Sequence, residues 1–374
     1  YWCFPNPHDE KGNSKEICDL LVLFKQVCII CQIKNYEFKE NHDRYFRKTV
    51  ESGAAQIQGA ERKLFKIDRD IYIKNEKQGL IKFNRVKYTQ IIRLVIHLGE
   101  GIQYQNLGRL SKSNYEFIHI LGKEDIKHLL NELVTISDFV DYLKSRELLA
   151  TKIEKIAIYG KEKDLLGLYL KIKPNFRKFI DSSKDKMLLV DLENGWKDYN
   201  LGKKNEENEE ILIEIESFIY DWVNTDLILN EKSREIAEEL MSLNRHERRV
   251  FSSALITFIH SYTAKGYKQI IRRNLSLNKI GFVFFYYPMG YTWKQLEQLK
   301  LIAAEGYALY LNYSIVNFIV IGISEGENLN IMHIDVTEFK NKNTEELKEV
   351  LKYLGWFEDK NMQHIEIDFN KKTG

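Results

Sequence analysis

The chain has 374 residues, 44% of them hydrophobic and 29% charged, which is enough apolar sequence for the cores of two or three domains. Its net charge of +2, from 56 basic and 54 acidic residues, excludes a uniformly basic nucleic-acid-binding protein, so any such surface must be local. With four prolines and no apolar run of about 18 residues, the sequence predicts neither a disordered tail nor a transmembrane segment.

Two short apolar runs near the start of the chain, residues 15–24 and 27–34, predict a pair of buried β-strands. The polar residues 25–26 between them predict the turn of a hairpin. A tight turn at this point pairs residues whose numbers add up to 51. The register therefore places Asp19 opposite Gln32.

The polar residues of this hairpin form the main candidate site. Side chains alternate along a strand, so Lys34 shares a face with Gln32 and lies diagonally beyond the pair of Asp19 and Gln32. A carboxylate and an amide carbonyl are ligands that suit Mg²⁺, and a nearby ammonium can orient or deprotonate a water and stabilise negative charge on a phosphorane. The three residues therefore predict a site that hydrolyses phosphodiester bonds.

The same residues resemble a known signature. Asp19, followed by Gln32 and Lys34 on the next strand, resembles the motif of the PD-(D/E)xK nuclease superfamily, and the Gln variant is similar to its Mrr-like restriction endonuclease branch. Residues 6–7, 15–22 and 56–62 are also similar to a group of uncharacterised bacterial proteins with this core. The resemblance implies that Asp19 and Gln32 bind Mg²⁺ or Mn²⁺, that Lys34 is catalytic, and that DNA is the substrate.

The resemblance also implies a glutamate, on a helix before the first strand, that completes the metal site. The sequence given begins at Tyr1, so we expect that this helix lies upstream of it. Glu16 is then a metal ligand or a residue that supports one. The alternatives are that Glu16 or Glu10 replaces the missing acid, or that the site is degenerate.

A purely structural interpretation accounts for each of the three residues taken singly. Asp19 can form a salt bridge with Lys34, and Gln32 can satisfy a backbone group. Their convergence on one hairpin favours the metal site. An inactive nuclease-fold DNA-binding protein remains the other alternative.

The four cysteines all lie in the opening strands, at positions 3, 18, 28 and 31. Cys28 and Cys31 have CxxC spacing, but residues three apart on a strand face opposite sides, and no second pair completes a zinc site. We expect these residues to be small core side chains in a protein of the reducing cytoplasm.

A helix is predicted over residues 44–63, with Asp43 as its cap. One of its faces carries polar side chains spaced by four residues, which can contact DNA phosphates or simply face water: Arg44, Lys48, Ser52 and Gln56. The resemblance suggests that Gln56 reaches toward the active-site face. Small residues over 53–60 predict that the helix lies close to the sheet.

Short strands are predicted between residues 64 and 121, and one long amphipathic helix over residues 123–147 closes the first domain. Residues 135–139 lie inside this helix with no assigned role. Turn and charge runs over residues 151–205 predict a connecting region.

Helices and strands alternate from residue 206 to the end, which predicts an α/β domain. The expected helices cover residues 207–223, 231–243, 246–264, 293–311 and 344–354, and the expected strands cover 281–288, 315–323, 330–336 and 365–369. The basic run of residues 265–274 includes Arg272 and Arg273, which either contact nucleic acid or form a solvated face.

The sequence thus predicts a mixed α/β protein with a nuclease-like domain over residues 1–150, a connecting region over 151–205 and a C-terminal α/β domain over 206–374 that senses, oligomerises or binds a partner. We expect a metal-dependent DNA endonuclease, and the resemblance suggests a role in bacterial defence against foreign DNA. The expected partners are DNA and a second copy of the chain or another protein of the same defence system, with no membrane. The alternative is a catalytically inactive scaffold.

Overall fold

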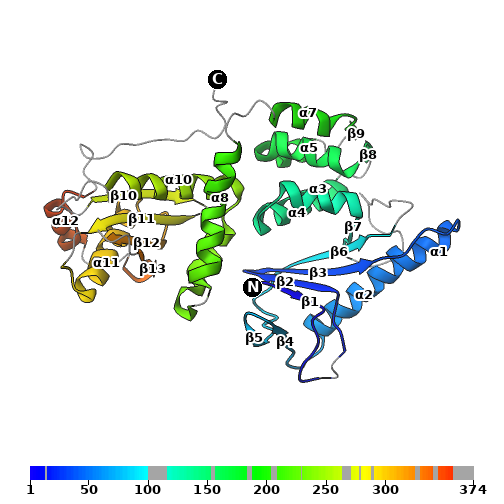
Figure 1. Cartoon of the computed structure of the whole chain (residues 1–374), viewed down its shortest axis with the longest axis horizontal. Helices are drawn as coiled ribbons and strands as arrows, with labels where there is room; N and C mark the ends of the chain where they lie inside the picture. The colour runs from blue at the N-terminus through cyan, green and yellow to red at the C-terminus, as the bar shows by residue number, and fades with distance from the viewer. Residues whose placement is uncertain are drawn as a thin grey trace. The chain divides into compact units, whose positions relative to one another are not determined.

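The computed structural model describes most of the chain, and the statements below concern those residues (Figure 1). They are residues 1–12, 15–99, 116–152, 156–182, 188–203, 209–228, 230–262, 271–277, 279–287, 290–324, 329–339 and 344–356. The chain divides into two compact units, Tyr1–Ile211 and Leu212–Gly374. Each unit is described by itself.

Unit 1 is built on a five-stranded mixed sheet with the order β1-β2-β3-β6-β7. Its strands are β1 (Cys3–Pro5), β2 (Leu20–Phe24), β3 (Val27–Lys34), β6 (Gln90–His97) and β7 (His119–Gly122). The first three strands are antiparallel, whereas β3, β6 and β7 are parallel. The carboxyl ends of these three parallel strands therefore lie at one edge of the sheet.

The predicted register of the β2–β3 hairpin is confirmed. Phe24 pairs with Val27 at the turn, and Leu20 pairs with Cys31 at the other end of the ladder. Lys25 occupies the turn with φ +49, a left-handed conformation that a tight hairpin requires.

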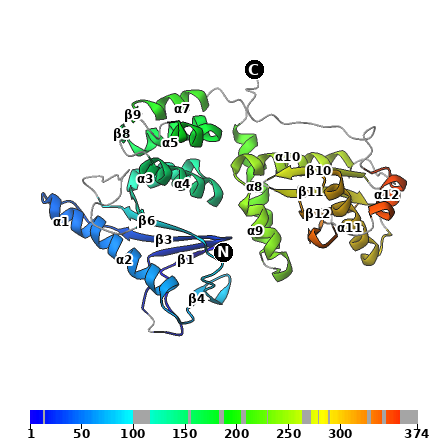
Figure 2. The ribbon, with the colours of Figure 1, turned by 180° about the vertical axis from the view of Figure 1, so that it is seen from behind.

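A long helical segment joins β3 to β6 and covers one face of the sheet (Figures 1 and 2). It consists of α1 (His42–Phe46), a π-helical turn (Arg47–Glu51), α2 (Ser52–Glu61) and a second π-helical turn (Arg62–Lys66). A Cβ added at Gly53 would lie 2.9 Å from Val95 Cγ1, so the glycine lets α2 approach β6 closely, as its small residues predicted. The predicted cap was wrong: Asn41, two residues earlier, accepts the backbone N–H of Arg44 at 2.8 Å.

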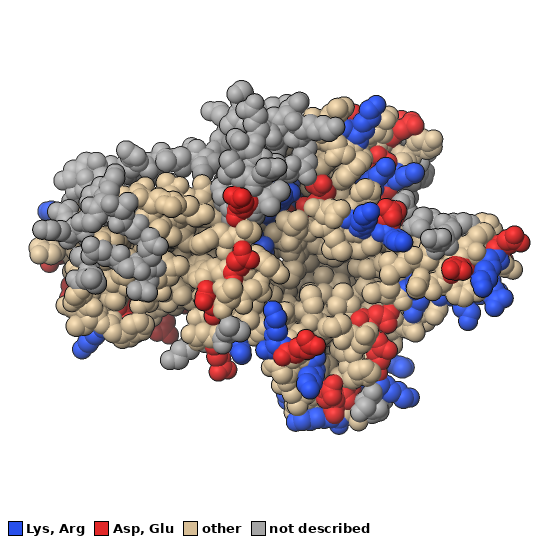
Figure 3. Space-filling model, viewed as in Figure 1, with Lys and Arg blue, Asp and Glu red and all other residues tan. Residues whose placement is uncertain are grey.

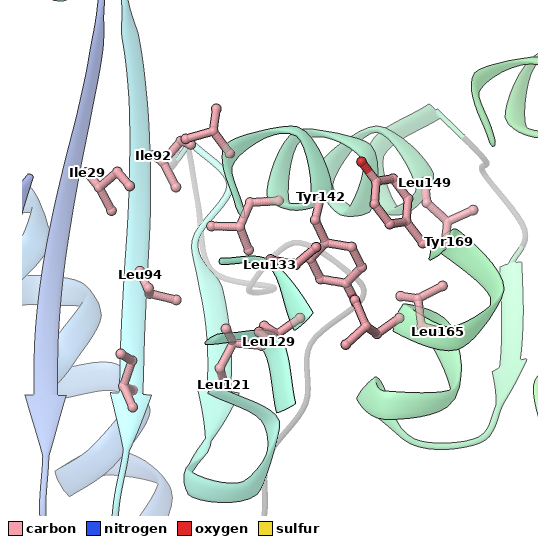
Figure 4. Close-up of a cluster of buried hydrophobic side chains, with 14 of the residues drawn as sticks. Ile29, Ile92, Leu94, Leu121, Leu129, Leu133, Tyr142, Leu149, Leu165 and Tyr169 are labelled. Atoms are coloured by element: carbon pink, nitrogen blue, oxygen red, sulfur yellow. The ribbon is translucent and has the colours of Figure 1, made fainter. Parts of the chain in front are cut away.

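A two-stranded hairpin, β4 (Tyr72–Asn75) and β5 (Gly79–Lys82), lies between this helical segment and β6. The opposite face of the sheet is covered by α3 (Lys123–Glu132) and α4 (Ile136–Lys152). Figure 4 shows the core between them, where Ile29, Ile92 and Leu94 of the sheet face Leu129 of α3, Leu133 just after it and Tyr142 of α4.

The prediction of a single helix over residues 123–147 is wrong, because residues 133–135 between α3 and α4 are not helical. The hydroxyl of Thr135 accepts the backbone N–H of Asp138 at 3.0 Å and donates to its carboxylate at 2.7 Å. Thr135 therefore caps α4, and residues 135–139, which had no assigned role, are a helix start.

The region expected to connect the two domains belongs to the core of unit 1. It contains β8 (Ile156–Tyr159), α5 (Glu162–Ile172), a 3₁₀ turn (Lys173–Asn175), α6 (Phe176–Asp181), β9 (Leu188–Asp191) and α7 (Gly195–Lys203). Leu166, Phe176 and Leu192 of this region are buried in the same cluster as Tyr142. The turn and charge runs of the sequence did not reveal these apolar contacts.

A group of charged side chains is buried beside that cluster. The Arg146 Nε donates to Glu162 Oε1 at 2.8 Å, and the Tyr142 hydroxyl donates to the same oxygen at 2.6 Å. Arg146 Nη1 lies 3.3 Å from His119 Nδ1. Burial lowers the pKa of His119 well below its usual value, and the positive charge of Arg146 lowers it further.

His119 predicts a specific loss of stability in acid. A histidine whose pKa is lowered on folding binds fewer protons than in the unfolded chain, so the free energy of unfolding falls as the pH drops below about 6.5, by up to about 1.4 kcal/mol per pH unit. Urea unfolding between pH 5 and 7.5 should show this slope for the wild type and a smaller slope for His119→Gln. Equal slopes in the two proteins would contradict the prediction.

Unit 2 contains a four-stranded sheet with the order β10-β11-β12-β13. The strands are β10 (Ile271–Leu277), β11 (Ile280–Tyr287), β12 (Asn317–Ser324) and β13 (Leu329–Asp335). The helices are α8 (Glu209–Trp222), α9 (Arg234–Ser242), α10 (Arg245–Tyr262), α11 (Trp293–Tyr310) and α12 (Thr344–Tyr353), with a π-helical turn (Val223–Leu227) and 3₁₀ turns (Glu231–Ser233 and Thr337–Phe339) between them.

Helices cover both faces of this second sheet. α11 connects the parallel strands β11 and β12 and packs with α12 on one face, and Phe251 of α10 contacts Phe282 and Phe284 on the other. The predicted mixed α/β class is confirmed. The expected strand over residues 365–369 lies outside the described residues. No described helix is long and apolar enough to span a membrane.

Candidate functional site

The three candidate residues come together at the carboxyl edge of β3. Asp19 directly precedes β2, and Gln32 and Lys34 end β3. In the parallel ladder with β6, Gln32 is aligned with Val95 and Lys34 with His97, so all of these side chains belong to the face that α2 covers. His97, which we had not assigned to the site, thus lies beside Lys34 and is fully buried.

The Asp19 carboxylate has a structural contact. Its Oδ2 accepts the backbone N–H of Ile33 at 2.5 Å, two residues after Cys31, where the β2–β3 ladder ends. The bond uses one carboxylate oxygen, so Oδ1 can accept a second ligand. Asp19 thereby fixes the end of β3, which carries Gln32 and Lys34.

Lys34 is held by the helix rather than by the aspartate. Its Nζ donates to Gln56 Oε1 on α2, and a Cβ added at Gly53 would lie 3.6 Å from Lys34 Cε. The salt bridge between Asp19 and Lys34 that a structural interpretation predicts is not formed. Gln56 of α2 therefore holds the Lys34 ammonium on the face of the sheet that this helix covers.

Gln32 supplies a buried amide on the same face. The residue is 4% exposed, in a position where most core residues are apolar. A buried carboxamide needs a hydrogen-bond partner or a cation to offset the loss of water. Together with Asp19 it forms a pair of hard oxygen donors, which fits Mg²⁺, an ion commonly held by one or two carboxylates with several waters.

A complete acidic cluster is not present among the described residues, where no group of three His, Cys, Asp or Glu side chains can hold a metal. Glu16 is exposed and pairs in a β-bridge with His8. The amide nitrogen of Asn6, oriented to donate, lies 3.2 Å from Glu16 Oε1 and 3.2 Å from the Asp19 carbonyl oxygen. Asn6 thus links the Glu16 carboxylate to the backbone of Asp19.

Glu10, the other substitute acid that we considered, lies along β4. Its backbone N–H donates to the Tyr72 carbonyl oxygen at 2.8 Å, and its side chain is exposed. Of the two substitutes, Glu16 is therefore the one linked to the backbone of Asp19.

The polar face predicted for the helix is exposed, but its alignment differs from a regular helix. Arg44, Lys48 and Gln56 are exposed and Ser52 is half-buried. The π-helical turn Arg47–Glu51 has more residues per turn than an α-helix and rotates the side chains that follow it. The spacing of four therefore does not keep all four side chains in one line.

The basic candidates of unit 2 are only partly described. Arg272 and Arg273 lie on β10, paired with Phe285 and Phe284, and their side chains lie outside the described residues, as do residues 263–270. Arg248, in the basic stretch of residues 245–249, is 5% exposed and donates to the backbone carbonyl of Met241 at 2.8 Å. That arginine stabilises the end of α9 and is not a surface cation.

The cysteines are free thiols, three of which are buried in the hairpin. Burial raises the pKa of Cys31 to about 12 and raises the pKa values of Cys18 and Cys28 as well. Protonated buried thiols are poor metal ligands and poor nucleophiles. Their environment is that of core side chains.

Comparison with known proteins gives no relative: no family model, no curated protein and no solved structure matches the chain. The chemistry of the site must therefore be argued from its own residues. The resemblance to the nuclease signature remains a prediction from the motif.

Proposed function

We propose that unit 1 is a metal-dependent nuclease that hydrolyses phosphodiester bonds of DNA. The observation that carries the proposal is the convergence of Asp19, Gln32 and Lys34 on one face at the carboxyl edge of β3, with the lysine held apart from the aspartate. A role in defence against foreign DNA and a location in the cytoplasm are the corresponding biological predictions.

Asp19 and Gln32 would hold the cation, and Mg²⁺ or Mn²⁺ bound there would supply Lewis-acid activation of a phosphoryl oxygen and of water. The carboxylate of Asp19 is kept in place by the Ile33 N–H. Lys34 supplies a positive charge that can orient the attacking water and stabilise the negative charge that builds on the phosphoryl oxygens. Gln56 accepts from Lys34, which holds this charge in the site.

The direct test is incubation of plasmid and linear DNA with the full chain in the presence of Mg²⁺, Mn²⁺ or EDTA. We expect cleavage that requires the metal and stops with EDTA. Metal-independent cleavage, or cleavage that persists in a variant with both Asp19→Asn and Lys34→Met, would assign the activity to a different site or a contaminant.

A second candidate function is binding of DNA without cleavage. It is favoured by the neutral Gln32 and by the absence of a third acidic ligand among the residues that the structure describes. Binding without metal-dependent cutting, unchanged by Asp19→Asn, would support this candidate and contradict the nuclease proposal.

Gln56 provides a test of how the lysine is positioned. Gln56→Ala removes the acceptor of the Lys34 ammonium, and we expect kcat to fall by about 10- to 100-fold with little change in KM, because the reacting charge is misplaced while the DNA-binding surface is kept. Gln58→Ala, two residues along the same helix, is the matched control and should retain activity. A change in KM alone would mean that Gln56 binds DNA and does not position Lys34.

A further inference from the structure

A lysine is buried in unit 2, a part of the chain that the proposed function of unit 1 does not involve. Lys300, on α11, is 1% exposed. Lysine is normally a surface residue, and Figure 3 shows Lys and Arg side chains on the visible face of the molecule. A fully buried lysine is usually paired with a carboxylate, so the contacts of Lys300 decide what its amine can do.

The Lys300 amine has two close neighbours, and neither is an acid. Its Nζ donates to Asn330 Oδ1 on β13, a neutral acceptor, and lies 5.2 Å from the centre of the Trp293 ring. No described carboxylate forms an ion pair with it, and Glu297, one turn earlier on α11, acts on it only from farther away. The ammonium form is therefore desolvated without a paired counter-charge, which favours the neutral amine.

The protonation of Lys300 reflects this environment. Burial lowers the pKa of its ammonium to about 8, and the negative charge of Glu297 opposes this effect. At pH 7.5 about a quarter of the amine is then neutral, against about 0.1% for an exposed lysine whose pKa is 10.5. The neutral amine is the nucleophilic form, so Lys300 is reactive at a pH where exposed lysines are protonated.

The burial of the amine limits which electrophile reaches it. A substrate with a bulky carbonyl group would require the contact between Lys300 and Asn330 to open, because Lys300 has almost no exposed surface. Carbon dioxide is small, linear and without a net dipole, so it enters a protein interior more readily than a polar carbonyl compound does. It adds to neutral amines and not to ammonium ions. Carbon dioxide is therefore the electrophile that fits both the burial and the protonation of this lysine.

We propose that Lys300 is a modification site, at which carbon dioxide adds reversibly to the buried amine and forms a carbamate. The lone pair of the nitrogen forms a bond to the carbon of carbon dioxide, one carbon–oxygen π bond opens and leaves the negative charge on oxygen, and the nitrogen releases a proton to solvent. The Asn330 amide, which accepts from the amine, has an NH₂ group that can donate to the carbamate after rotation of the side chain. The modification thus replaces a neutral or positive group by an anion between α11 and β13.

The test is ¹³C NMR of the full chain in ¹³C-labelled bicarbonate at pH 7.5. We expect a carbamate resonance from Lys300 in the wild type. Lys300→Met keeps a side chain of similar length without the amine, and Lys300→Arg keeps the positive charge and the donors, so both should lose the resonance. Lys294→Arg, at an exposed lysine of the same helix, is the matched control and should keep it.

Unfolding of the wild type in urea is the second measurement. It should remove the resonance at the same pH, because the exposed amine regains its ordinary pKa. A resonance that survives in urea, or one that persists in the folded Lys300→Met or Lys300→Arg protein, comes from other amines and overturns the proposal. A wild type without a carbamate resonance overturns it as well. None of these outcomes depends on DNA cleavage, so the proposal stands or fails separately from the nuclease function of unit 1.

Discussion

Asp19→Asn is expected to lower metal-dependent DNA cleavage by at least about 10³-fold without loss of the folded structure. The substitution separates the two roles of the side chain. Asparagine keeps an oxygen that can accept the Ile33 backbone N–H, so the end of β3 stays in place. It removes the only negative charge that the Asp19 and Gln32 pair offers to a cation. The measurement is the rate of plasmid cleavage at saturating Mg²⁺, with the urea midpoint as the check on folding.

Two companion variants make this result specific. Asp19→Ala removes both the charge and the acceptor, so it should be inactive and also less stable, by about 1–3 kcal/mol for an unsatisfied backbone donor. Asp43→Asn, on the exposed face of α1, should behave as the wild type. Full activity of Asp19→Asn would show that the carboxylate has only its structural role, and the DNA-binding alternative would then be the better one.

The correct predictions of structure came from local patterns in the sequence. The apolar runs and the polar turn defined the β2–β3 hairpin and its register, because a shift of one residue would turn every apolar side chain to the wrong face. The approach of α2 to the sheet followed from its small residues, of which Gly53 is the contact point. The convergence of Asp19, Gln32 and Lys34 on one face followed from the same two patterns.

The features that the sequence did not predict depend on contacts between distant residues or on a choice between similar local signals. Asn41 and Asp43 are both good caps, and the sequence alone did not decide between them. Thr135 begins a new helix, although the helical spacing of the apolar residues continues across it and therefore predicted one uninterrupted helix. The hydrogen bond from Lys63 Nζ to the backbone carbonyl of Lys15 spans 48 residues, and no periodicity reports it.

Glu162→Ala is expected to destabilise unit 1 by about 3–5 kcal/mol, the largest effect on stability that we predict for a single substitution. Arg146 is 1% exposed and Glu162 is 3% exposed, so removal of the carboxylate leaves a buried guanidinium without its counter-charge. The Tyr142 hydroxyl loses its acceptor at the same time. The measurement is the free energy of unfolding of unit 1 from urea denaturation, with the exposed Glu193→Ala as a control expected to stay within about 0.5 kcal/mol of the wild type.

The double variant Arg146→Met with Glu162→Leu decides what the pair contributes. Desolvation of two buried charges costs about as much as their attraction returns, so replacement of both by apolar side chains of similar size is expected to recover most of the stability lost in Glu162→Ala. His119 would then lose the positive neighbour that lowers its pKa, and the acid-dependent fall in stability should become smaller. A double variant as unstable as Glu162→Ala, with an unchanged pH slope, would mean that the network sets the packing of α4 against α5 and that charge is secondary.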